Sequence, residues 1–188
     1  MGVSAFNRVK CAAILAGGAS SRMGREKALL EIEGTPLVRR TADFLRPLFG
    51  QIAVITAKPQ VARAADLPAI SDIFPDCGPL GGVHAALSHF GAPTFCVACD
   101  MPFLNLKLIA WLRDNFEGDA LVPISNHGPE PLHAVYSPAC GAVFETYLRA
   151  REKIPSLRRV LAEVDTRWVE ETFGADFSNW NTPHDLGI

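Results

Sequence analysis

The chain has 188 residues, of which 48% are apolar and 20% are charged, and its formal net charge is −2. This length and balance are typical of a globular protein with a self-sufficient core, and we expect residues 1–188 to form a single domain. A net charge near zero argues against a nucleic-acid-binding surface. No apolar stretch approaches the ~20 residues of a membrane helix, and residues 1–10 lack the apolar core of a secretory signal. We therefore expect a cytoplasmic protein that does not bind membranes.

The expected elements alternate between strands and helices. Strands are predicted at 9–15, 52–56, 69–71, 95–99, 120–123 and 167–170, and residues 132–136 form a further candidate for which antiparallel pairing is the hypothesis. Helices are predicted after the capping pair Thr35-Pro36 and at 83–90, 106–116, 138–149 and 157–163. Strands that are apolar almost throughout are typical of burial on both faces. The alternation therefore predicts a mostly parallel sheet with helices on both sides.

The five cysteines are an odd number, which argues against a disulfide framework. Cys96 and Cys99 have the C-x-x-C spacing, but they lie in an apolar, strand-like stretch rather than at the exposed start of a helix. No second pair of cysteines or nearby pair of histidines completes a zinc site. We expect buried structural thiols here.

A glycine-rich loop follows the first expected strand, with the sequence LAGGASSRMGREK at residues 15–27. Glycines allow a backbone to approach a ligand closely, and the exposed N–H groups of such a loop form an anion site. Arg22 and Lys27 add positive charge. The loop therefore predicts binding of a polyphosphate, as in a nucleoside triphosphate, while an ordinary surface loop stays open as the alternative.

Two common phosphate-binding motifs do not fit this loop. A Walker loop requires G-x-x-x-x-G-K-[ST], but Gly18 and Gly24 are one residue too far apart and Arg25 follows Gly24. The dinucleotide fingerprint G-x-G-x-x-G fails because Ala19 stands where the second glycine is needed.

Two aspartates follow expected strands, and in open sheets ligands bind beyond the carboxyl ends of strands. Asp100 follows 95–99, where a carboxylate can hold a Mg²⁺ ion that bridges nucleotide phosphates; capping of a helix is the alternative. Asp72 follows 69–71 and precedes the stretch GPLGG at 78–82. The glycines of that stretch allow close approach to a base or ribose, with a plain turn and a close-packed helix start as the alternative.

From Ala12 to Leu186, the chain resembles the molybdenum cofactor guanylyltransferases. The resemblance rests on the glycine loop, on GPLGG at 78–82, on CDMP at 99–102 and on NWNTP at 179–183, in the family's order and spacing. The glycine loop and CDMP are shared with sugar-nucleotide and cytidylyl transferases, whereas GPLGG and NWNTP indicate the guanylyl branch. The resemblance implies a three-layer, Rossmann-like α/β nucleotidyltransferase fold with a mostly parallel, mixed central sheet.

The same resemblance implies roles for single residues. The nucleotide would be bound by Leu15, Ala16, Gly17, Gly18, Lys27, Asp72, Gly78, Leu80 and Asp100. The catalytic residues would be Lys27, Asp100 and Arg22, with Asp100 as the metal ligand. Asn179 and Asn181 would face the pterin. Independently of the resemblance, Glu130 lies in a loop before His133 and is a further candidate to face the pterin or a second metal. An asparagine of the second strand in some members is replaced by Ile55, so its contact is expected to be lost or taken by Thr56.

The implied reaction transfers GMP from GTP to the phosphate of molybdenum-loaded molybdopterin, with Mg²⁺ as cofactor, giving molybdopterin guanine dinucleotide and pyrophosphate. Proteins that deliver molybdopterin and the target molybdoenzymes are the expected protein partners. Two alternatives stay open. One is a related transferase, such as a molybdopterin cytidylyltransferase or a sugar-1-phosphate nucleotidyltransferase. The other is a GTP-binding adaptor that delivers the cofactor without catalysis.

Overall fold

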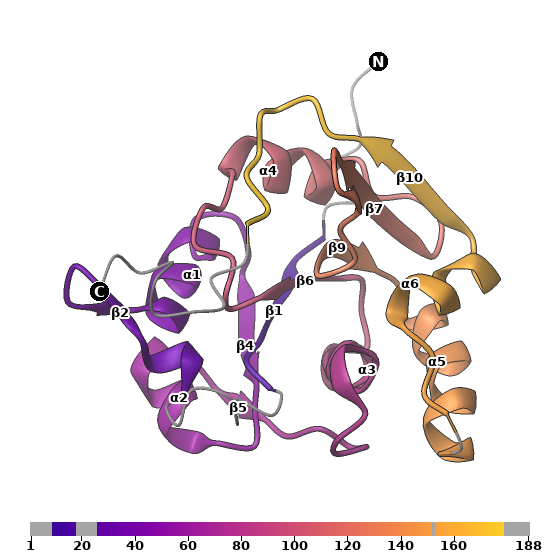
Figure 1. Cartoon of the computed structure of the whole chain (residues 1–188), viewed down its shortest axis with the longest axis horizontal. Helices are drawn as coiled ribbons and strands as arrows, with labels where there is room; N and C mark the ends of the chain where they lie inside the picture. Colours follow the sequence, from indigo (N-terminus) through magenta and orange to yellow (C-terminus); the bar gives the residue numbers. More distant parts are fainter. Residues whose placement is uncertain (1–8, 18–25, 152, 179–188) are drawn as a thin grey trace.

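The computed structural model describes residues 9–17, 26–151 and 153–178 (Figure 1). Its main sheet contains β1 (Cys11–Leu15), β4 (Gln51–Ile55), β5 (Ala69–Ile70), β6 (Thr94–Ala98), β7 (Ala120–Ser125), β8 (Gly128–Pro129), β9 (His133–Tyr136) and β10 (Thr166–Glu170). The strand order is β10-β7-β9-β6-β1-β4-β5, with β8 paired to β7. β1 pairs in parallel with β4 and β6, whereas β9 runs antiparallel between β6 and β7. The mostly parallel, mixed sheet and the antiparallel pairing of 132–136 are therefore confirmed.

Helices cover both faces of this sheet (Figure 1). They are α1 (Leu37–Leu45), α2 (Pro59–Ala65), α3 (Gly78–Phe90), α4 (Leu106–Asp114), α5 (Pro138–Ala150) and α6 (Leu157–Val160), with 3-10 turns η3 (Lys27–Leu29) and η4 (Leu161–Glu163). Helices α1, α2 and α4 pack on one apolar cluster, and α3, α5 and α6 pack on another. Neighbouring residues of β1 divide between the two, with Ala13 on the α3 side and Ile14 on the α1 side. The three-layer order is confirmed. Among the described residues, no helix is long and apolar enough to cross a membrane.

The first helix begins later than the sequence predicts. Thr35 and Pro36 form β3 (Thr35–Pro36), which pairs antiparallel with β2 (Glu31–Ile32), and α1 starts at Leu37. The connecting residues Glu33 and Gly34 both have positive φ, at 51° and 76°. This is the backbone that a two-residue hairpin requires, so the local turn takes the Thr-Pro pair away from the helix.

Cys96 and Cys99 are buried, as predicted, and all five cysteines are free thiols. Burial is the main reason that the pKa of Cys99 rises to about 12, and the neighbouring Asp100 adds to the effect. Cys99 is therefore a protonated thiol at neutral pH, and its proximity to Asp100 gives it no nucleophilic role.

His133, on β9, is a buried histidine enclosed by aromatic rings. It is 2% exposed, and the rings of Phe95 and Phe177 meet it edge to face, each at a centroid distance of 5.2 Å. Neither imidazole nitrogen has a hydrogen-bond partner among the described residues. Burial lowers the pKa of His133 to about 3, so the ring is neutral in the folded protein at physiological pH.

This burial makes stability depend on pH. The unfolded chain protonates His133 near its ordinary pKa of about 6.5, whereas the folded chain does so only near 3. The free energy of unfolding should therefore fall as the pH drops from 6.5 towards 3, by up to about 1.4 kcal/mol per pH unit from this group. Urea unfolding of the wild type and of His133→Phe, at several pH values in this window, measures the effect. The variant should show the shallower slope, and parallel pH profiles would contradict the assignment.

Candidate nucleotide site

Four neighbouring parallel strands, β5, β4, β1 and β6, end at one edge of the sheet. Leu15, the last residue of β1, is in register with Ile55 of β4 and Ala98 of β6. Beyond this rung, the N–H of Ala16 donates to the carbonyl of Ile55 at 3.0 Å, and the N–H of Cys99 donates to that of Leu15 at 3.1 Å. The chain after each strand therefore emerges at the same place, where the sequence predicts the ligand.

An ion pair links the far end of the glycine loop to the end of β6. Lys27 Nζ lies 2.6 Å from Asp100 Oδ2, and the two side chains are 19% and 22% exposed. Lys27 opens η3, and Asp100 lies two residues after β6, so residues far apart in sequence meet here. The cation expected to bind phosphate and the carboxylate expected to bind metal are therefore paired with each other.

Asp72 lies between the start of the glycine loop and the start of α3. A Cβ built on Gly17 would lie 3.8 Å from Asp72 Oδ2, and one built on Gly82 would lie 4.0 Å from Asp72 Oδ1. Oδ1 is buried and has no hydrogen-bond partner among the described residues. Burial, and then repulsion by Asp76, raise the pKa of Asp72. A buried acceptor without a donor costs free energy, and a ligand N–H or O–H could supply that donor.

The stretch 78–82 is the first part of α3 rather than a turn before a helix at 83. Gly78 has a φ of +62°, and Pro79 follows in the first turn, where its missing N–H costs nothing. Gly81 packs tightly on the preceding loop, because a Cβ there would lie 3.0 Å from the Phe74 carbonyl oxygen. Leu80 as a whole is 1% exposed and belongs to the core, so its side chain is not available to a nucleotide.

The residues at the end of β4 offer the ligand little side-chain chemistry. Ile55 is 2% exposed and lies against the start of α3, where its Cγ2 is 4.0 Å from a Cβ built on Gly82. Thr56 is 3% exposed, and its Oγ1 accepts a hydrogen bond from the N–H of Lys58 at 3.1 Å. The structure thus gives the Thr56 hydroxyl a local partner within the loop.

Glu130 lies at the same edge of the sheet, in the loop before β9. β9 begins beside the end of β6, since His133 is in register with Val97. The Ser125 hydroxyl donates to Glu130 Oε1 at 2.6 Å, which fixes the carboxylate against the β7–β8 hairpin. Four further predicted site residues lie outside the described residues: Gly18, Arg22, Asn179 and Asn181.

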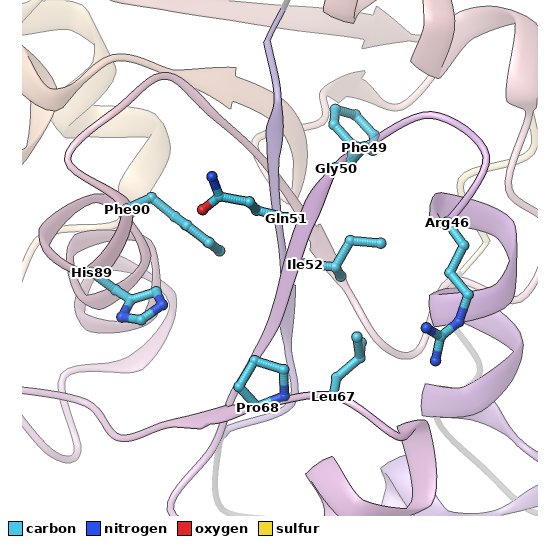
Figure 2. A pocket seen from close by; sticks show the side chains of 9 residues that line it. All are labelled: Arg46, Phe49, Gly50, Gln51, Ile52, Leu67, Pro68, His89 and Phe90. Carbon is cyan, nitrogen blue, oxygen red and sulfur yellow. The ribbon is translucent and has the colours of Figure 1, made fainter.

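A pocket of about 540 Å³ lies elsewhere, at the amino end of β4 (Figure 2). It is lined by Arg46, Phe49, Gly50, Gln51, Ile52, Leu67, Pro68, His89 and Phe90. Arg46 Nη2 donates to the carbonyls of Ala65 and Asp66 at 2.9 and 3.2 Å, so its guanidinium is engaged by the protein itself. No predicted nucleotide-binding residue lines this pocket, which makes the opposite edge the candidate site.

Comparisons with known proteins identify relatives of this chain. The model of the MobA-like NTP transferase domain matches residues 12–168. A probable molybdenum cofactor guanylyltransferase of Pelotomaculum thermopropionicum is 38% identical over 92% of this chain and 88% of its own length. The molybdenum cofactor guanylyltransferase of Syntrophotalea carbinolica is 36% identical over 93% of this chain and 88% of its own length.

Solved structures share the fold. The molybdopterin-guanine dinucleotide biosynthesis protein A of Archaeoglobus fulgidus superposes with a TM-score of 0.76, at 26% identity, covering 94% of each chain. A CMP:2-keto-3-deoxy-manno-octonic acid synthetase complexed with CTP has a TM-score of 0.70 at 16% identity, with 95% of each chain covered. The second likeness concerns the fold alone.

The tight packing of Gly81 generates a prediction. In Gly81→Ala, the new Cβ would lie 3.0 Å from the Phe74 carbonyl oxygen and 3.2 Å from the Cys77 Cβ, so the loop that carries Asp72 must shift. We expect the affinity for GTP to fall by about 10-fold or more, because small displacements of positioning groups are costly. Isothermal titration measures it. Gly141→Ala, in α5, is the matched control, since its Cβ would meet only Leu87 at 3.7 Å; equal affinities of the two variants would contradict the prediction.

Proposed function

The chain belongs to the MobA-like NTP transferases, and from this membership and its site we propose that it transfers GMP from GTP to molybdenum-loaded molybdopterin. The observation that carries the proposal is the pairing of Lys27 with Asp100 beside the glycine loop, at the carboxyl end of β6. Relatives that are 36–38% identical over nearly the whole chain bear the name of this activity, which favours GTP over other nucleotides.

In the proposed reaction, a phosphate oxygen of molybdopterin attacks the α-phosphorus of GTP and forms a new P–O–P linkage. The bond between the α-phosphorus and the oxygen that bridges to the β-phosphate breaks, and pyrophosphate leaves with that electron pair. A phosphate monoester is largely ionised at neutral pH, so no general base is needed to create the nucleophile. The main demand on the protein is to bring two anions together and to offset the charge on the leaving group.

Asp100 is the proposed ligand of Mg²⁺. Magnesium is usually held by one or two carboxylates and completes its coordination with water and substrate phosphates. The chain fits that pattern, because Asp100 supplies a partly exposed carboxylate at the carboxyl end of β6. When bound, the ion would offset negative charge on the phosphates. Lys27 offsets the charge of Asp100 in the free protein and would contact phosphate in the complex, together with Arg22.

Asp72 and the glycine loop form the proposed nucleoside side. Leu15, Ala16 and Gly17 would contact the nucleotide through their backbones at the end of β1, and Gly78 and Leu80 through theirs at the start of α3. The unpartnered Oδ1 of Asp72 would accept a hydrogen bond from guanine or ribose. That hydrogen bond would supply a donor to Asp72 Oδ1, a site oxygen that is buried without a hydrogen-bond partner among the described residues.

The acceptor side is assigned to Glu130, Asn179 and Asn181, with the Ser125 hydroxyl holding Glu130. The proposal also includes protein partners that supply molybdopterin and molybdoenzymes that receive the product. Because the reaction draws on GTP and a metabolic cofactor, we place the enzyme in the cytoplasm.

Release of pyrophosphate tests the function. The wild-type protein is supplied with Mg²⁺ and molybdenum-loaded molybdopterin under anaerobic conditions, and GTP is compared with CTP, ATP and UTP. Release with GTP alone is expected. Preference for CTP would assign the protein to the cytidylyl alternative, and GTP binding without release from any nucleotide would favour the adaptor.

The metal assignment predicts the behaviour of Asp100→Asn. The amide keeps the shape of the side chain but removes the negative charge, so turnover should fall by about 100-fold or more while the fold stays intact. Steady-state rates and circular dichroism measure both. Lys27→Ala is the companion variant, in which affinity for the triphosphate should fall. Near-normal turnover of Asp100→Asn would contradict the assignment.

The role of Asp72 can be resolved by choice of nucleotide. A hydrogen bond to a carboxylate contributes roughly 1.5–3 kcal/mol, so Asp72→Ala, which removes the acceptor, should weaken GTP binding by about 10- to 100-fold. If the guanine 2-amino group is the donor, ITP, which lacks that group, should lose less affinity than GTP on mutation. If ribose is the donor, 2′-deoxy-GTP should show the smaller loss. Equal GTP affinity in wild type and variant would remove Asp72 from the site.

A further inference from the structure

Two ion pairs hold neighbouring residues of the chain on either side of β1. Glu26 Oε2 pairs with Lys58 Nζ, and the next residue, Lys27, pairs with Asp100. Lys58 lies three residues after the end of β4, whereas Asp100 lies two residues after the end of β6. β1 lies between β4 and β6 in the sheet (Figure 1). Glu26 and Lys27 are therefore fastened to the ends of both strands that flank β1.

The backbone of Lys58 is itself held in the turn between β4 and α2. Its N–H donates to Thr56 Oγ1 at 3.1 Å, and its carbonyl accepts from the N–H of Val61 at 3.0 Å. The N–H of Thr56 donates in turn to the carbonyl of Ile70, in β5, at 2.8 Å. These hydrogen bonds tie Lys58 to the edge of the sheet, and from there its side chain reaches Glu26.

Glu26 directly precedes η3, the 3-10 turn that Lys27 opens. The carbonyl of Glu26 accepts from the N–H of Leu29 at 3.0 Å, and Ala28 within the turn is buried in the core. The Glu26 side chain is only 15% exposed, whereas that of Lys58 is 47% exposed. A carboxylate that is largely withdrawn from water is unfavourable unless a cation or a donor compensates it. Lys58 supplies that compensation and thereby fixes the start of the turn that carries Lys27.

We infer that Glu26, held by Lys58, is a positioning residue for Lys27, the cation proposed to contact the triphosphate. The Glu26–Lys58 pair fixes the backbone from which Lys27 extends, so that its ammonium group lies at the end of β6 beside Asp100. The inference rests on the proposed function, in which Lys27 binds phosphate. Neither Glu26 nor Lys58 contacts a substrate in this arrangement. Loss of the pair should therefore weaken GTP binding by acting through Lys27.

The first test removes the charge of either member of the pair. In Lys58→Met and in Glu26→Gln, we expect GTP affinity to fall by about 10-fold, because small displacements of positioning groups are costly. The matched control is Arg39→Met, which breaks the exposed ion pair of Arg39 with Asp43 in α1 and should leave GTP affinity unchanged. Isothermal titration measures the affinities. Thermal unfolding checks the fold, and the Tm of each variant should stay within about 4 °C of the wild type, because partly exposed ion pairs contribute little to stability.

A double-variant comparison tests whether Glu26 acts through Lys27. In a Lys27→Ala background, Glu26→Gln should cost little further GTP affinity, which is the result expected of residues that act through one contact. A general structural role of Glu26 would weaken GTP equally in both backgrounds. Fully additive losses would therefore overturn the inference, as would unchanged GTP affinity in Lys27→Ala alone.

Reversal of the pair distinguishes positioning from direct contact between Lys58 and phosphate. Glu26→Lys combined with Lys58→Glu re-forms the ion pair with the opposite polarity. It should restore most of the GTP affinity that either single reversal loses. If Lys58 itself bound phosphate, the double reversal would place a carboxylate against the triphosphate, and affinity would stay as low as in Lys58→Glu alone. That result would overturn the inference.

The outcomes separate this inference from the function on which it rests. Wild-type GTP affinity in both Lys58→Met and Glu26→Gln would overturn the inference and leave the proposed function standing. A wild-type protein that binds no GTP would overturn the proposed function, and the inference with it.

Discussion

The backbone hydrogen bonds that join β5, β4, β1 and β6 in parallel bring the ends of these four strands to one edge of the sheet. Parallel strands end on the same side, so the chain segments that follow them must meet there. Register makes the alignment strict, because Leu15 stands opposite both Ile55 and Ala98. Gly17, Asp72 and Asp100 all come within two residues of a strand end, and their meeting follows from the sheet rather than from contacts with one another.

Charge compensation is the second constraint on this edge. A carboxylate placed for a metal ion is unfavourable when the ion is absent, unless a cation replaces it. Lys27 meets that need at 2.6 Å from Asp100, and it is also the cation proposed to contact the triphosphate. Asp72 is treated differently, since its Oδ1 is buried without a partner in the described part of the chain and its pKa is raised. One carboxylate is thus paired within the protein, whereas the other has an oxygen without a partner among the described residues. This difference is consistent with the proposed division between phosphate and nucleoside.

Much of the fold could be predicted from the sequence, because its central strands are short apolar stretches bounded by polar or glycine-rich segments. The antiparallel pairing of β9 could also be predicted, since apolar and polar residues alternate less cleanly in residues 132–136 than in the parallel strands. The start of α1 could not be predicted, because the Thr35-Pro36 pair has the composition of a helix cap. Only the positive φ of Glu33 and Gly34 places the pair in a hairpin instead. α2 was missed although Pro59 marks its first turn, since the following QVARAA is too short to show a helical period.

The candidate site, like the fold, could be predicted from the sequence only in part. Sequence motifs identified Lys27, Asp72 and Asp100 singly, but no spacing indicated that Lys27 and Asp100 would form an ion pair across 73 positions. The packing of Phe177 on His133 could not be predicted either, because it joins residues 171–178, which have no regular secondary structure, to the internal strand β9. Long-range contacts of this kind depend on the assembled sheet. The helix was expected to begin at 83, whereas GPLGG at 78–82 forms its first part, and Gly81 lies against the preceding loop.

A crystal structure of the protein with GTP and Mg²⁺ would test the central claim most directly. The triphosphate should lie at the edge formed by Gly17, Asp72 and Asp100, with Lys27 turned from the carboxylate towards phosphate. A nucleotide bound elsewhere, such as in the pocket lined by Arg46 and His89, with the Lys27–Asp100 pair unchanged, would contradict it.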